Sequence, residues 1–258
     1  MTIIPLAAGG AYCIDKTEVT KGQYTQFLKA NVAVSSQIDV CKVANSTFTP
    51  LKAWPAAKSP QPEEHSFSLP AHYVDWCDAY AYCTWAKKEL CGQIGGGPVS
   101  VADGSDGTKA AWYSACSAGG NLAYPYGVTF NKSKCNGPTD PVIPTTPTRY
   151  GDVQNDDEGL YTVGVSNGVG DLTGIPPEYA PCNGGVDDLY QMSGNVAEWV
   201  NSCSGTTSSD TCAVRGGSYL AGNDPAALAC NAVRMMPRVP APADIELLKD
   251  IGFRCCAF

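Results

Sequence analysis

The most informative part of this chain reads LYQMSGNVAEWV at residues 189–200 and, after a polar loop, VRGGSY at residues 214–219. Both pieces are apolar, contain aromatic residues and carry glycine at fixed places. Gly194, Gly216 and Gly217 indicate backbone that turns with a positive φ or closely approaches another segment. The pattern therefore predicts two strands joined through turns.

The first of these turns has two interpretations. Asn195 follows Gly194, and Glu198 lies three residues further on, so hard oxygen ligands stand near exposed carbonyl groups. Calcium prefers such ligands. The alternative is a buried strand, a capped turn and a second strand without any ion. Spacing alone leaves both open.

The bulk composition points to one loop-rich domain that covers residues 1–258. Hydrophobic residues make up 44% of the chain, which allows a sizeable core, and 27 glycines and 19 prolines favour loops over regular elements. No internal repeat or linker separates independent units. The net charge of −8 and the lack of a basic run exclude nucleic acid as a partner, because phosphate binding needs clustered Lys and Arg.

Thirteen cysteines and two histidines indicate disulfides rather than zinc sites. We therefore expect a secreted, periplasmic or cell-surface location. Spacing favours Cys203–Cys212 as a local disulfide. The odd count leaves one thiol free or paired with another chain, so a disulfide-linked or assembled oligomer is one expectation. We predict no transmembrane segment, since no run of about 18 apolar residues occurs. Residues 1–10 lack the features of a signal peptide, and we expect any leader to have been removed.

Local patterns predict the regular elements. We expect helices at residues 21–29, 76–90 and 109–116, with Thr20, Asp75 and Thr108 at their starts. We expect strands within residues 3–14, broken at Gly9 and Gly10, and a C-terminal strand at residues 251–258 that pairs with them. Residues 32–70 look like loop. The acidic run at residues 155–158 is either a solvated loop or part of a cation site.

With these pieces in order, the chain resembles the formylglycine-generating enzyme (sulfatase-modifying factor) family. The matching segments occur in the family's order and span nearly the whole chain: residues 12–20, 72–85, 108–120, 124–127, 189–199, 215–219 and 252–255. The resemblance implies an α+β fold, the family's variant of the C-type lectin fold, rich in loops and stapled by disulfides. It also implies the pairs Cys83–Cys255 and Cys116–Cys230, each closing a loop that could contribute about 4 kcal/mol.

The resemblance further implies structural calcium. Carried over by position, the ligands of a first site are Gln191, Gly194, Val196 and Glu198. Gln191 departs from the family's Asn or Asp. A second site would use Asn136, Gly137 and an acid at Asp156 or Asp157.

The family's catalytic pattern is broken. Its copper(I) ion needs two thiolates in Gly-Gly-Ser-Tyr-x-Cys-x4-Cys, because soft ligands hold this soft metal. Here Ala221 stands at the first cysteine and Pro225 or Ala226 at the second. We therefore expect no copper. Arg215, Ser218, Tyr219 and Ala221 would be the vestigial frame of the site, with no catalytic residue. Ala197 also replaces a large aromatic residue, which alters packing or opens a pocket.

Three functions follow as hypotheses. The first is a non-catalytic extracellular binding or surface-assembly module whose loops at residues 218–229 hold a peptide, a glycan or a partner protein. The second is a diverged oxidoreductase that acts on cysteine-containing peptides and uses the free thiol. The third is a structural component of a surface layer or filament. Two histidines, both before residue 73, argue against the fold's iron-dependent relatives.

Overall fold

Two four-stranded sheets form the framework of the computed structural model, which describes residues 1–54, 67–132, 134–135, 182, 185–222 and 224–258. The first sheet has the order β1-β2-β8-β3, all antiparallel, with bounds Thr2–Pro5, Ala11–Ile14, Cys255–Ala257 and Glu89–Leu90. The second has the order β6-β5-β4-β7, with bounds Val233–Pro237, Thr211–Arg215, Ala197–Cys203 and Ile251–Phe253. Within it β4 and β7 are parallel. The predicted strand pair at the N-terminus and its pairing with the C-terminal strand are confirmed.

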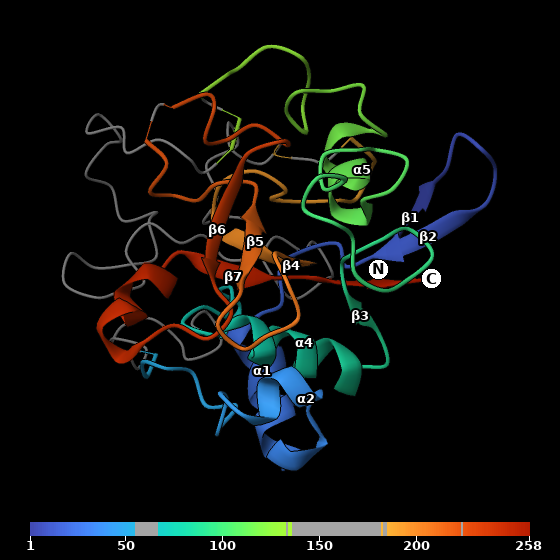
Figure 1. Cartoon of the computed structure of the whole chain (residues 1–258). Coiled ribbons are helices and arrows are strands. Elements are labelled where there is room, and N and C mark those ends of the chain that lie inside the picture. Colours follow the sequence, from blue (N-terminus) through green and yellow to red (C-terminus); the bar gives the residue numbers. More distant parts are fainter. Residues whose placement is uncertain (55–66, 133, 136–181, 183–184, 223) are drawn as a thin grey trace.

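The helices are short: α1 (Lys21–Lys29), α2 (Asp39–Lys42), α4 (Trp76–Trp85) and α5 (Ala111–Ser117), with 3-10 turns η1 (Val34–Ser36) and η3 (Pro242–Leu248). Figure 1 shows α1, α2 and α4 grouped on one side, whereas α5 lies near the β1–β2 hairpin. Thr20 and Asp75 each begin a helix, as the sequence predicts, and each forms a capping box.

Three predicted boundaries were wrong. α4 ends at Trp85 instead of residue 90, because the chain turns at Lys87 (φ 60°) and enters β3. α5 begins at Ala111 without a side-chain cap, since the Thr108 hydroxyl donates to Asp106 instead. The expected loop at residues 32–70 contains η1 and α2 within its described part.

Aromatic rings fill the core between α1, α4 and β7. Tyr24 stacks on Tyr82 at 5.8 Å between ring centroids, and both rings meet Phe253 edge-on. Phe27 packs against Tyr82 and Trp85. Such contacts add to the free energy gained from burial alone. The Tyr24 and Phe27 side chains of α1 thus face the core.

Six disulfides tie the loops to this frame. They are Cys41–Cys77, Cys83–Cys255, Cys91–Cys256, Cys116–Cys230, Cys135–Cys182 and Cys203–Cys212. All thirteen cysteines fall within the described residues, and Cys13 alone keeps its thiol. The list includes the local pair favoured by spacing and the two pairs implied by the family resemblance.

The last eight residues join the two sheets. β7 runs in one sheet, β8 in the other, and the fully buried Arg254 stands between them. The two disulfides of Cys255 and Cys256 hold β8 to α4 and to the end of β3. The N- and C-termini therefore lie close together (Figure 1). None of the helices in the described ranges is long and apolar enough to cross a membrane.

Candidate functional site

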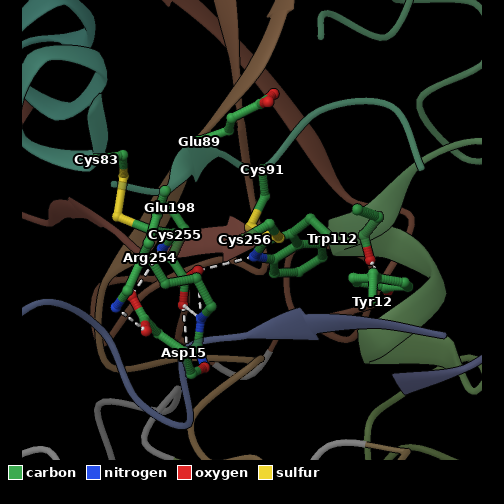
Figure 2. The surroundings of a disulfide bond; sticks show 12 residues. Tyr12, Asp15, Cys83, Glu89, Cys91, Trp112, Glu198, Arg254, Cys255 and Cys256 are labelled. Carbon is green, nitrogen blue, oxygen red and sulfur yellow. Dashed lines mark hydrogen bonds and ion pairs between the residues drawn. A yellow bond between two sulfur atoms is a disulfide. The ribbon is translucent and has the colours of Figure 1, made fainter. Parts of the chain in front are cut away.

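A buried ion pair lies beneath the turn at residues 191–196. Arg254 donates to both carboxylate oxygens of Glu198, from Nη2 to Oε1 at 2.6 Å and from Nε to Oε2 at 2.7 Å. Trp112 Nε1 donates to Oε2 at 2.8 Å. Figure 2 shows the carboxylate enclosed between the guanidinium and the indole. Because both charges are buried, this geometry compensates the desolvation that each would otherwise suffer.

Glu18 is a second acid in the same cluster. Its Oε1 accepts from Asn195 Nδ2 at 2.9 Å, while Oε2 lies 4.0 Å from Arg254 Nη2 and has no hydrogen-bond donor among the described residues. Burial raises the pKa of Glu18 to about 8, against the lowering effect of Arg254. Gln191 Oε1 is likewise buried without a donor in this part of the chain. Glu18 Oε2 and Gln191 Oε1 are therefore two buried oxygens that could bind a cation, a proton or a water molecule.

A cavity of about 320 Å³ opens on the second sheet. Ala197 on β4 and Val214 on β5 contribute to its walls, and loops within residues 217–232 and the segment from η3 to Asp250 complete them. Two glycines allow this loop to return close to the sheet. A Cβ on Gly217 (φ 63°) would lie 2.2 Å from Ala227 O, and one on Gly216 (φ 86°) would meet Met192 O at 2.8 Å.

Asp250 organises the polar side of the cavity. The Ser218 hydroxyl donates to its Oδ2 at 2.6 Å, and Arg234 Nη2 donates to Oδ1 at 3.1 Å. The Asp250 carbonyl accepts the Ala197 N–H at 2.8 Å, which fixes the acid beside the alanine. Both carboxylate oxygens are thus occupied within the protein. No histidine lines the cavity among the described residues, so Ser218 has no general base there.

Of the two remaining charged residues of the cavity, Glu246 has a paired charge and Lys249 has none among the described residues. Glu246 bonds to Lys52 at 2.7 Å and accepts from the Tyr73 hydroxyl at 3.1 Å. Lys249 has no carboxylate within ion-pair distance in the described part of the chain. Three aliphatic side chains on the rim are strongly exposed: Leu220 (42%), Val233 (49%) and Leu247 (49%). The cavity thus combines an apolar rim with one uncompensated cation.

The sequence profile of the sulfatase-modifying factor enzyme 1-like domain matches residues 8–257. This chain belongs to that family.

One curated relative and two solved structures show distant similarity to this chain. The mouse formylglycine-generating enzyme is 27% identical over 207 residues, which is 75% of this chain and 45% of the mouse protein. The chain therefore spans about half the length of that curated relative. The crystal structure of CarF shares the fold, with a TM-score of 0.50 and 18% identity over 96% of this chain and 86% of that one. PvdO from Pseudomonas aeruginosa gives a TM-score of 0.48 at 18% identity, over 96% and 81% of the two chains.

The four residues of the expected vestigial frame separate in space. Ser218 and Ala221 line the cavity. Arg215 turns away from it and donates to Ser105 Oγ at 3.3 Å, and burial lowers its pKa to about 10. Tyr219 is also buried and packs with Leu69. Two of the four residues therefore belong to the cavity wall, and the other two are buried away from it.

No described thiol reaches the positions of the family's copper ligands. Ala221 lines the cavity, while Pro225 and Ala226 lie on the exposed loop beyond it. Cys230, the cysteine nearest in sequence, is bonded to Cys116. Cys13 lies on β2, in the other sheet.

The expected calcium ligands fall on one turn and on the strand that follows it, but Glu198 is engaged elsewhere. Gln191 and Gly194 have positive φ, and Val196 directly precedes β4. Glu198 lies on β4 and directs both oxygens to Arg254 and Trp112. The side-chain oxygens of Gln191 and Glu18 that no described residue bonds suit a hard cation. The expected second site, Asn136, Gly137 and Asp156 or Asp157, lies outside the described residues.

Sequence reasoning missed several residues that shape these sites. Asp250, Arg234 and Lys249 come to the cavity from β6 and from the segment before β7, and no motif marks them. The sequence gives one weak sign that Glu18 is buried: it is an acid in an apolar segment between a strand and a helix, and the family resemblance includes that segment. Its cationic neighbour Arg254, however, lies more than 200 residues away in the sequence.

Proposed function

We propose that this chain is a non-catalytic binding module that holds its ligand in the cavity beside Ala197. The observation that supports this proposal is that Ala221, which aligns with the family's first copper cysteine, lines the cavity, and that the described lining contains no thiol. A methyl group at Ala221 neither binds copper nor transfers electrons. Twelve of the thirteen cysteines are consumed in disulfides, which leaves Cys13, in the other sheet, as the remaining thiol.

The module works in a secreted, periplasmic or cell-surface setting. Six disulfides support this location, because such a number does not persist in a reducing cytosol. In this proposal the fold is the family's single-domain variant of the C-type lectin fold. Its loops at residues 217–232 present the cavity to a peptide, a glycan or a partner protein.

Copper(I) titration and peptide turnover test the absence of catalysis. The purified protein with intact disulfides is titrated with copper(I) and then incubated with oxygen and a Cys-x-Pro-x-Arg peptide. We expect no stoichiometric copper binding and no conversion of the peptide cysteine. Stoichiometric copper together with turnover would overturn the proposal.

A diverged oxidoreductase is the second candidate, and the partly exposed thiol of Cys13 is the observation that favours it. This activity would act on cysteine-containing peptides and would need Cys13. Turnover that disappears in a Cys13→Ser variant, without any copper, would support this candidate over the binding module.

We also infer that calcium stabilises the turn at residues 191–196. Gln191, the carbonyls of Gly194 and Val196, and Glu198 would hold the ion, with Glu18 as a further carboxylate. A bound calcium ion would neutralise the buried acids and cross-link the turn. The buried oxygens of Gln191 and Glu18 that have no donor among the described residues support this role, whereas Glu198 would have to share its oxygens with Arg254. Calcium should raise the melting temperature relative to EDTA, and much less so in a Gln191→Ala variant.

A further inference from the structure

We infer that the cavity takes an aliphatic side chain of a peptide whose next residue is acidic. This inference rests on the proposed function and names the ligand class of the same site. Four features of the described residues carry it: the small floor, the exposed aliphatic rim, the pairing of the polar groups and the charge of Lys249.

The floor accepts a single bulky side chain. Ala197, Ala221 and Ala227 contribute only methyl groups to the wall. A volume of about 320 Å³ is at the lower end for ligand pockets, so it suits one or two residues of a peptide rather than a large ligand. Ala197 sets the depth, because its N–H bond to the Asp250 carbonyl fixes its methyl group beside the acid.

The rim supplies the apolar driving force. Leu220, Val233 and Leu247 belong to three different segments, yet all three are 42–49% exposed around one opening. Exposed aliphatic side chains that gather at one place mark contact surfaces. An entering leucine or isoleucine would bury them and itself from water.

The polar groups favour a peptide over a sugar. A sugar needs several free hydrogen-bonding groups and an aromatic ring on which its C–H face stacks. Here the Ser218 hydroxyl and Arg234 are both bonded to Asp250, and Glu246 is held by Lys52 and Tyr73. No aromatic side chain lines the cavity within the described ranges.

The charge of Lys249 favours a peptide with an acidic residue next to its aliphatic side chain. Asp250 is compensated by Arg234, and Glu246 is compensated by Lys52. Because Lys52 lies outside the wall and neutralises Glu246, Lys249 is the charge on the wall that has no ion-pair partner among the described residues. A carboxylate on the residue beside the aliphatic side chain would pair with it, whereas a cationic residue would be repelled.

Four probes, three of them acetylated and amidated peptides, test the inference by NMR titration of the isotope-labelled protein with intact disulfides. Three are the tetrapeptides Gly-Leu-Asp-Gly, Gly-Leu-Lys-Gly and Gly-Ser-Asp-Gly, and the fourth probe is free mannose. We expect Gly-Leu-Asp-Gly to bind at least about tenfold more tightly than the other three, with shifts confined to the cavity wall. Lys249→Glu should reverse the preference between the Asp and Lys peptides.

Variants inside and outside the cavity test whether the peptide binds at this place, separately from which ligand class it belongs to. Ala197→Trp fills the floor and should abolish binding, and Leu247→Ser on the exposed rim tests the same surface without a buried change. Lys87→Glu, an exposed charge reversal outside the cavity, should bind like the original protein. Equal affinity for the three peptides, preference for mannose, or unchanged binding in both cavity variants overturns the inference. Mannose binding that Ala197→Trp removes would leave the binding module standing, whereas copper-dependent turnover would overturn the proposed function itself.

Discussion

Asp75 is a buried acid that begins α4. Its Oδ1 accepts the N–H of Asp78 at 2.9 Å, but its Oδ2 has no donor among the described residues. Burial raises the pKa of Asp75 to about 7, against hydrogen bonds that lower it, and burial followed by the charge of Asp75 raises the pKa of Asp78. The folded protein therefore holds these protons more tightly than the unfolded chain does.

The raised pKa of Asp75 makes the stability of the protein depend on pH. Because the folded pKa of Asp75 lies above its unfolded value near 3.8, its favourable contribution is complete below that value and is lost as pH rises through about 7. Asp75→Asn keeps the oxygen that caps the helix and removes the titration. We expect the variant to be more stable than the original protein above pH 7, by about 1–4 kcal/mol. Urea unfolding between pH 5 and about 9 measures this.

The control for this prediction is Asp39→Asn. Asp39 is exposed and pairs with Lys42, which lowers its pKa, so the substitution should not produce the gain at high pH. A flat stability profile in the original protein, or an Asp75→Asn profile parallel to it, contradicts the assignment.

Arg254 is a fully buried cation that pairs with the buried carboxylate of Glu198. It holds Glu198 in a forked pair and also donates to the carbonyls of Asp15 and Tyr190. A lysine keeps the charge but has no planar fork. We expect Arg254→Lys to lower the free energy of unfolding by about 3 kcal/mol, because a buried carboxylate loses part of its compensation.

The exposed counterpart is Arg234, which pairs with Asp250 while its own side chain is 44% exposed. Arg234→Lys should cost less than about 1 kcal/mol. Chemical denaturation of both variants compares the two sites. Equal costs would show that the Arg254 pair is no more stabilising than a surface pair.

At the scale of elements, the two capped helix starts were easier to predict than the end of α4. The capping boxes at Thr20 and Asp75 depend on side chains three residues apart, which the sequence displays directly. The end of α4 depends on Lys87 adopting a positive φ so that Glu89 and Leu90 can pair with β8. That partner lies more than 160 residues away, and no local pattern contains it.

The two C-terminal disulfides act as one staple. Cys83 and Cys91 are close in sequence, and their partners Cys255 and Cys256 are adjacent. While either disulfide remains, removing the other reopens only a short loop of about ten residues. Replacing one pair with alanine should therefore cost about 2–3 kcal/mol, whereas replacing both pairs should cost about 7–8 kcal/mol. The strong non-additivity distinguishes shared loop closure from independent contacts.

Denaturation of the two single-pair variants and the four-alanine variant measures this cycle. Cys203–Cys212 is the internal standard, since it closes a loop of similar length by itself, with a sequence separation of 9. Its removal should cost about as much as either single pair. Additive costs within experimental error would contradict the shared-loop account.

At the scale of the molecule, the family resemblance predicted more of the fold than of the site. The resemblance implied the pairs Cys83–Cys255 and Cys116–Cys230, which are confirmed. The C-terminal strand was predicted from its local pattern and is confirmed as well. The parallel pairing of β7 with β4 was missed, because Ile251, Gly252 and Phe253 show no sign of their partner. The cavity was foreseen as one of two consequences of Ala197. Its charges were not, because Arg234 and Lys249 become neighbours only through the fold.

Cys13 is the thiol through which we expect copies of this chain to join covalently. On β2 it stands opposite Ile3 of β1 and Ala257 of β8, so its partly exposed thiol shares a sheet face with these apolar side chains. In an oxidising compartment an accessible thiol on such a face forms a disulfide with a second copy. We expect non-reducing gel electrophoresis of the native protein to show a covalent dimer that reduction converts to monomer.

The variant Cys13→Ser decides between assembly and an inert thiol. It should remove the dimer and change the free energy of unfolding by less than about 1 kcal/mol, because Cys13 takes part in none of the six disulfides. Maleimide labelling of the folded monomer should modify one thiol per chain. A monomer that labels fully but never dimerises contradicts covalent assembly. A dimer that persists in Cys13→Ser shows instead that one of the six internal disulfides exchanges between chains, since no other thiol is present in the folded protein.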